Sequence, residues 1–185
     1  SALVLAPLVL PPVVTGFLLL SVLGTNTPFG GALASLGLPG PFTLLGAALA
    51  AFVVGMPLYV ISILGAFEAI DSKYEELSST LGVTPRRTFL RISLPLALPG
   101  IAAGAVLAFA RALGEFGATV VLAGNVEGST RPIALAVYTL LESPQRQEQV
   151  WLLVGASVAV SLLALFGFEV LSRRQKQRLE DRHGR

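Results

Sequence analysis

The chain has 185 residues, of which 54% are hydrophobic and only 13% are charged, with a formal net charge of +2. A soluble domain of this length carries about a quarter charged residues. No charge occurs before Glu68, and uncharged runs longer than the ~20 residues that cross a bilayer indicate membrane helices. The composition therefore excludes an ordinary soluble domain and predicts an all-α integral membrane protein. The absence of cysteine excludes disulfides and thiolate metal sites.

About four membrane spans are predicted, separated by runs that are polar or rich in glycine and proline. They comprise residues 2–23, 42–67, 97–123 and 150–171. The first run is not a cleaved signal peptide, because it lacks a basic leader and is interrupted by Pro7, Pro11 and Pro12. A kink is expected near Pro57, since proline removes a helix hydrogen bond. A re-entrant or surface helix is expected around residues 133–141.

The distribution of basic residues predicts the orientation. They cluster after residue 171 and within residues 68–95, whereas the opposite connections hold only Arg131 and Arg146. By the positive-inside rule, the two basic clusters face the cytoplasm. Residues 1–171 are therefore predicted to form a transmembrane domain, and residues 172–185 a basic cytoplasmic tail at the C-terminus.

A polar island interrupts the apolar sequence after the second predicted span. Four of its apolar side chains recur at helical intervals, namely Ile70, Tyr74, Leu77 and Leu81. Residues 71–81 are therefore predicted to form an amphipathic helix. Gly82 is placed to end that helix, and Thr84-Pro85 to cap and begin a second short helix. The expected result is a helix–Gly–helix elbow to which another protein can bind.

Within this island, Glu76 is followed six residues later by Gly82 and, after nine more residues, by Ile92-Ser93-Leu94-Pro95. The spacing resembles the EAA loop of ABC-importer permeases, although Leu77 and Ser78 replace the two alanines. The resemblance implies that residues 68–95 form a cytoplasmic loop that couples the membrane domain to an ATPase. The resemblance assigns the coupling to the ATPase to Glu76, Leu77, Leu81 and Gly82. The two leucines are expected to enter a cleft of the ATPase, and the glutamate to contact the rim of that cleft.

Two further segments narrow the resemblance. Residues 7–17, Pro-Leu-Val-Leu-Pro-Pro-Val-Val-Thr-Gly-Phe, and residues 113–125, Leu-Gly-Glu-Phe-Gly-Ala-Thr-Val-Val-Leu-Ala-Gly-Asn, are similar to segments of molybdate permeases. The chain thus resembles the molybdate/tungstate (molybdate-sulfate) family of permeases. The expected substrate is a tetrahedral oxyanion. Molybdate or tungstate is the first candidate, and sulfate or thiosulfate is the alternative. Such permeases usually have a further helix before this point, so an N-terminal helix is expected to be missing.

The third predicted span carries two charges, Arg111 and Glu115. Being four residues apart on one helical face, they can pair within the membrane, where ionisable groups usually face a bundle interior or a wet pathway. One interpretation is that they line the substrate pathway, with Thr119 one turn further on the same face. The carboxylate would then lower the affinity of the arginine for the anion. The alternative interpretation is a salt bridge that only fastens two helices.

The resemblance also implies partners. It predicts a prokaryotic plasma (inner) membrane assembly of two permease copies, two ATPase subunits and one external oxyanion-binding protein, with no nucleic acid. No Gly-x-x-x-x-Gly-Lys-Ser/Thr loop occurs, so ATP and Mg²⁺ are expected on the ATPase, and this chain is expected to hold no cofactor or metal. Two other classes stay open. An intramembrane enzyme would need convergent catalytic groups that the spans lack, and a passive channel or membrane scaffold would need no coupling elbow.

Overall fold

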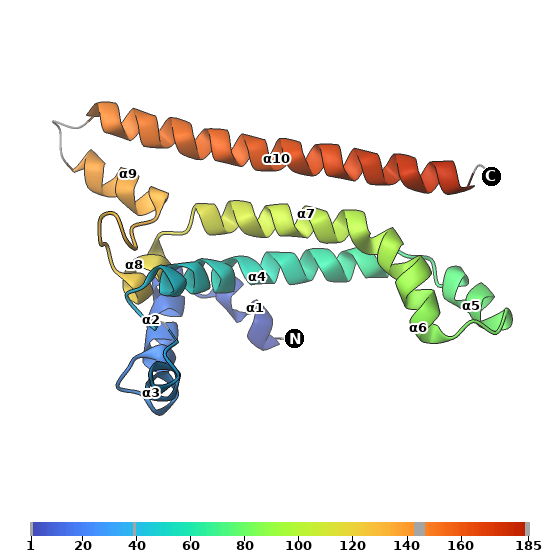
Figure 1. The fold of residues 1–185 in the computed structure, drawn as a ribbon, viewed down its shortest axis with the longest axis horizontal. Coiled ribbons are helices and arrows are strands. Elements are labelled where there is room, and N and C mark those ends of the chain that lie inside the picture. The colour runs from blue at the N-terminus through green and yellow to red at the C-terminus, as the bar shows by residue number, and fades with distance from the viewer. Residues whose placement is uncertain (1, 39, 143–146, 184–185) are drawn as a thin grey trace. The chain divides into compact units, whose positions relative to one another are not determined.

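The computed structural model describes residues 2–38, 40–142 and 147–183, and every regular element in these ranges is a helix (Figure 1). In chain order the elements are α1 (Ala2–Val9), α2 (Pro12–Leu23), α3 (Pro28–Ser35), α4 (Leu44–Glu68), α5 (Lys73–Thr80), α6 (Pro85–Thr88), the π-helix η1 (Phe89–Ser93), α7 (Leu94–Leu113), α8 (Gly117–Ala123), α9 (Ile133–Leu141) and α10 (Gln147–His183). They form two compact units, one of residues 1–57 and 108–162 and the other of residues 58–107 and 163–185. The predicted all-α class is confirmed.

Three continuous helices are long and apolar enough to cross a membrane, namely Leu44–Glu68, Pro85–Leu113 and Glu148–Gly167. Helices α2 and α3 meet the same test only as a pair, which is bent by 65°. The described residues therefore contain three candidate spans, or four if the bent pair is one span. This agrees with the predicted number. Pro57 lies buried inside α4, and the kink expected there stays a prediction.

The first predicted span, residues 2–23, is wrong as a single helix. The chain leaves helical geometry at Pro11, whose φ of −55° and ψ of 136° are extended. A residue before a proline is pushed out of the helical region, and Pro12 then begins α2, where its missing N–H is harmless. The following connection is not irregular throughout, because it contains α3. The Thr27 hydroxyl caps α3 by accepting a hydrogen bond from the N–H of Gly30 at 3.0 Å.

The third predicted span, residues 97–123, is also wrong as a single helix. Helix α7 ends before Gly114, and α8 begins at Gly117. In an unbroken helix the N–H of Ala118 would donate to the carbonyl oxygen of Gly114. Here it donates to Oε1 of Glu115, 2.7 Å away. A side-chain acceptor thus replaces the helical one, and glycine is a poor helix former at the position of the break.

The remaining helices follow the prediction closely. Helix α4 matches the second predicted span to within two residues, and α9 has the predicted bounds of 133–141. The fourth predicted span lies within α10, which continues as a helix to His183 through most of the predicted basic tail.

Helices α2 and α8 pack at a very short distance in the first unit. A Cβ added at Gly16 would lie 2.7 Å from the carbonyl oxygen of Ala118, so the absence of a side chain permits this approach. A buried apolar cluster joins Ala50 and Val54 of α4 to Ala118 and Leu122 of α8. Helix α8 is therefore held by α2 and by α4.

We predict that Gly16→Ala lowers the free energy of unfolding of the detergent-purified chain by about 1–3 kcal/mol, and with it the melting temperature, because the added methyl group must push α8 away from α2. The matched control is Gly65→Ala, since a Cβ at Gly65 meets nothing within 4 Å. In α4 that change should be neutral or stabilising by up to about 1 kcal/mol. Equal melting temperatures for the two variants would show that the close approach of α2 to α8 does not stabilise the fold.

Candidate functional site

The elbow between α4 and α7 has the local structure that its sequence predicts. Gly82 has a φ of +70°, its N–H donates to the carbonyl of Ser79, and the N–H of Val83 donates to the carbonyl of Ser78, both at 3.0 Å. These paired bonds end α5 with a left-handed glycine. Thr84 is extended and precedes Pro85 at the start of α6, as predicted, but its hydroxyl makes no capping hydrogen bond. The predicted helix–Gly–helix arrangement is confirmed.

A buried hydrogen bond holds the two arms of the elbow together. The hydroxyls of Ser78 on α5 and Thr88 on α6 lie 2.6 Å apart, and both side chains are buried. At the base of the elbow, the rings of Phe67 and Phe89 stack with their centroids 5.8 Å apart. A buried hydroxyl left without its partner costs about 1–3 kcal/mol, so the hydrogen bond stabilises the contact between α5 and α6, and the ring contact joins the elbow to the end of α4.

The outer face of the elbow is apolar and exposed. Leu77 and Leu81 are 62% and 79% exposed, and Glu76 is exposed beside them. A cavity of about 380 Å³ opens next to this face, and Glu75, Glu76, Ser79, Val83, Pro85, Thr88 and Phe89 line it. The elbow therefore presents two projecting leucines next to an acidic hollow, a surface suited to a partner that has an apolar cleft.

Arg111 and Glu115 form the predicted ion pair. Nη1 of Arg111 donates to Oε2 of Glu115 at 2.8 Å, and the two side chains are 34% and 1% exposed. The other carboxylate oxygen accepts from the N–H of Ala118. The buried charge of Glu115 is thus compensated by one cation and one backbone dipole, which lowers the free energy of burying it.

Thr119 does not continue the face of this pair as predicted. The helix is broken between Arg111 and Thr119, so the two residues do not share a helical face. Thr119 is buried, and its hydroxyl donates to the carbonyls of Phe116 at 3.0 Å and Glu115 at 3.4 Å. The structure therefore brings Arg111 and Glu115 together and places Thr119 as a packed residue in the first turn of α8.

Residues 1–177 match the family described as binding-protein-dependent transport system inner membrane component. The chain belongs to this family. Over 174 residues it is 45% identical to the molybdenum transport system permease protein ModB of Haemophilus influenzae, an alignment that covers 94% of the chain and 76% of that relative. It is 44% identical over 173 residues to ModB of Escherichia coli, with 93% and 76% covered. The sulfate transport system permease protein CysT of Escherichia coli is 33% identical over 182 residues, with 97% and 64% covered.

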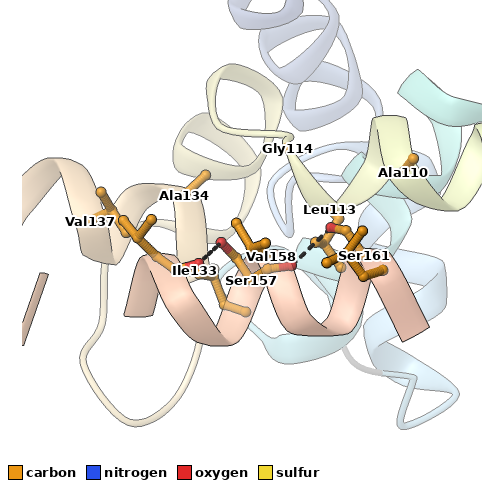
Figure 2. A pocket seen from close by; sticks show the side chains of 11 residues that line it. Ala110, Leu113, Gly114, Ile133, Ala134, Val137, Ser157, Val158 and Ser161 are labelled. Carbon is orange, nitrogen blue, oxygen red and sulfur yellow. Dashed lines mark hydrogen bonds between the residues drawn. The ribbon is translucent and has the colours of Figure 1, made fainter. Parts of the chain in front are cut away.

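This inner membrane component has a further cavity of about 540 Å³ between α7, α9 and α10 (Figure 2). Its lining is apolar except for Ser157 and Ser161 of α10. Both hydroxyls donate within α10, that of Ser157 to the carbonyl of Val154 and that of Ser161 to the carbonyl of Ser157, each at 2.8 Å. Dashed lines in Figure 2 mark these bonds. Among the described residues the lining of the cavity holds no charged side chain, so these residues offer no charge-assisted donor for an oxyanion.

The sequence prediction for this family member missed the backbone partner of Glu115. The signal for it lies in Gly114-Glu115, where a poor helix former precedes a side chain that can accept from the next N–H groups. No group of three histidine, aspartate or glutamate side chains within the described ranges is arranged to hold a metal.

Proposed function

We propose that this chain is the membrane-spanning permease subunit of an ATP-driven importer of molybdate, and that the chain itself is not catalytic. The observation that carries the proposal is the 45% identity to a molybdenum permease over most of the chain, against 33% to a sulfate permease. Tungstate has the same tetrahedral shape and charge as molybdate, so we group the two. Sulfate or thiosulfate is the second candidate, supported by the similarity to CysT.

The elbow is the proposed coupling element. Leu77 and Leu81 would enter an apolar cleft of an ATPase subunit, Glu76 would contact the rim of that cleft, and Gly82 would hold the required turn. The proposed assembly has two copies of this chain, two ATPase subunits that bind ATP and Mg²⁺, and one external oxyanion-binding protein. Closure of the ATPases would then displace both elbows as rigid bodies and switch the pathway by alternating access.

The ion pair is the proposed substrate contact. Arginine carries five N–H donors, and Arg111 uses one of them in the contact with Glu115, so the partly exposed guanidinium keeps donors for an oxyanion. Glu115 would reduce the affinity of this site, which an ion must leave as readily as it enters. Thr119 supports the site by packing behind Glu115.

Reconstitution of the four-subunit complex with its binding protein in proteoliposomes tests the proposal. We expect ATP-dependent uptake of molybdate that excess tungstate inhibits and excess sulfate does not. Faster uptake of sulfate than of molybdate would transfer the proposal to the second candidate. Uptake that proceeds without ATP would instead indicate a passive channel.

We predict that the elbow faces the cytoplasm and that the connection between α8 and α9 faces outside. Because the chain has no cysteine, single cysteines can report this by labelling with a membrane-impermeant maleimide in intact cells. Ser129→Cys should be labelled, whereas Ser72→Cys should be labelled only after permeabilisation. Both positions are exposed, and Ser129 is preferable to Gly128, whose φ of +75° disfavours a side chain. The reverse labelling pattern would invert the orientation.

A further inference from the structure

One buried side chain bridges the junction between α7 and α8. The two carboxylate oxygens of Glu115 accept from different helices, Oε2 from Arg111 of α7 at 2.8 Å and Oε1 from the N–H of Ala118 of α8 at 2.7 Å. The carboxylate therefore links the proposed substrate contact to the first turn of α8. Loss of the bond to Arg111 would therefore alter the bond that the carboxylate accepts from the N–H of Ala118.

The residues that flank α8 contact α9, in addition to the close packing of α8 on α2. The rings of Phe116 and Tyr138 have their centroids 5.2 Å apart at an angle of 59°, and Nδ2 of Asn125 donates to Oγ1 of Thr139 at 3.3 Å. By contrast, a Cβ added at Gly114 would meet only carbonyl oxygens of the preceding turn, at 3.9 Å. Among the described residues, no other helix lies within 4 Å of that Cβ position at Gly114, where α7 joins α8.

The bond between Arg111 and Glu115 is the one that a substrate can compete for. The Arg111 side chain is 34% exposed, whereas Glu115 is 1% exposed. A doubly charged oxyanion attracts a guanidinium more strongly than a singly charged carboxylate does at the same distance, and arginine binds such groups through paired N–H donors. If Arg111 turns to the oxyanion, Glu115 keeps a single backbone donor inside the protein. A buried charge with half of its partners is destabilised and moves towards water, releasing the N–H of Ala118.

We propose that Glu115 is a positioning residue that couples oxyanion binding at Arg111 to release of α8 from α7. The empty site has the carboxylate bound to both helices, and the occupied site has the α7–α8 junction loosened at Gly114. The inference rests on the proposed function, because it takes the transported oxyanion as the ligand of Arg111.

Hydrogen–deuterium exchange of the complete nucleotide-free complex tests this coupling, because the amide of Ala118 is the donor that the mechanism releases. We expect millimolar sodium molybdate to accelerate exchange several-fold in peptides that cover residues 115–123. Sodium chloride at the same ionic strength should not do so. Peptides from residues 97–104 of α7 serve as the internal control and should exchange at an unchanged rate.

Two variants separate coupling from a merely structural role. Arg111→Gln should abolish the response to molybdate. Glu115→Gln should also abolish it, because a neutral amide is not destabilised when Arg111 turns away, although the amide oxygen of glutamine can still accept from the N–H of Ala118. A structural role predicts that both variants raise exchange with and without molybdate.

Uptake measured on the same preparation distinguishes the two proposals. A complex that imports molybdate but shows unchanged or slower exchange in residues 115–123 would overturn the coupling and leave the proposed function standing. Equal acceleration in the control peptides would also overturn it, since that result reports general loosening. A complex that imports no molybdate would overturn the proposed function and the coupling with it.

Discussion

Replacing Gly82 with proline should reduce molybdate uptake by the complete complex to background while the chain still inserts into the membrane. Gly82 combines a φ of +70° with an N–H that donates to Ser79. Proline fixes φ near −65° and has no N–H, so it can satisfy neither requirement. The turn that directs α5 against α6 would be lost, together with the surface that carries Leu77 and Leu81. Uptake, membrane insertion and co-purification with the ATPase subunit are the measurements.

Gly82→Asn is the matched control, because asparagine tolerates the left-handed conformation and keeps the N–H. Its uptake should stay close to that of the unmodified complex. Glu76→Lys tests the surface rather than the turn, since it reverses a charge on an exposed side chain. It should abolish uptake with the elbow folded. If Gly82→Pro and Glu76→Lys both support normal uptake, the elbow is not the coupling element.

The elbow could be predicted from the sequence because its structure depends on local signals. A glycine ends α5, a proline begins α6, and both act through their own backbone geometry. Helices α4 and α9 were predictable for a related reason, since length and apolar character are properties of a single segment. None of these features requires knowledge of what the segment packs against.

The two broken spans show where such reasoning fails. Hydropathy reports which residues can lie in lipid but not where the backbone hydrogen bonds stop. At Pro11-Pro12 the local signal for a break is present, but the apolar character continues across it and predicts a single span. At Gly114 the break depends on Glu115 reaching the N–H of Ala118 while α8 packs on Gly16, a residue about a hundred positions earlier. No periodicity in either segment reveals that contact.

The same break explains how much of the ion-pair site could be foreseen. Spacing of four residues was enough to predict that Arg111 and Glu115 pair, since the bond forms at the end of α7. The placement of Thr119 required the helix to continue, and it does not. The bond from Ala118 to Glu115 lies outside any helical pattern, so the sequence could predict the pair but not its attachment to α8.

Replacing Arg111 with alanine should cause a severe loss of molybdate uptake with ATP hydrolysis retained. The change leaves Glu115 buried with one backbone donor, and an anion then meets a negative charge where it previously met a nearly neutral pair. Two unit charges 4 Å apart interact with about 4 kcal/mol at an effective dielectric constant near 20, which is enough to exclude an anion from a narrow passage. Adding Glu115→Gln removes that negative charge, so the double variant should recover part of the uptake.

A salt bridge that only fastens helices predicts a different outcome for the same three proteins. Removing either partner takes the counter-charge from the other, and Glu115 is 1% exposed, so both single variants would lower the melting temperature of the complex. Uptake per folded complex would then stay nearly unchanged, and the double variant would recover stability rather than transport. Uptake, ATPase rate and thermal stability measured for Arg111→Ala, Glu115→Gln and the double variant therefore separate the two roles, because uptake per folded complex falls for a pathway residue and stays nearly unchanged for a fastener.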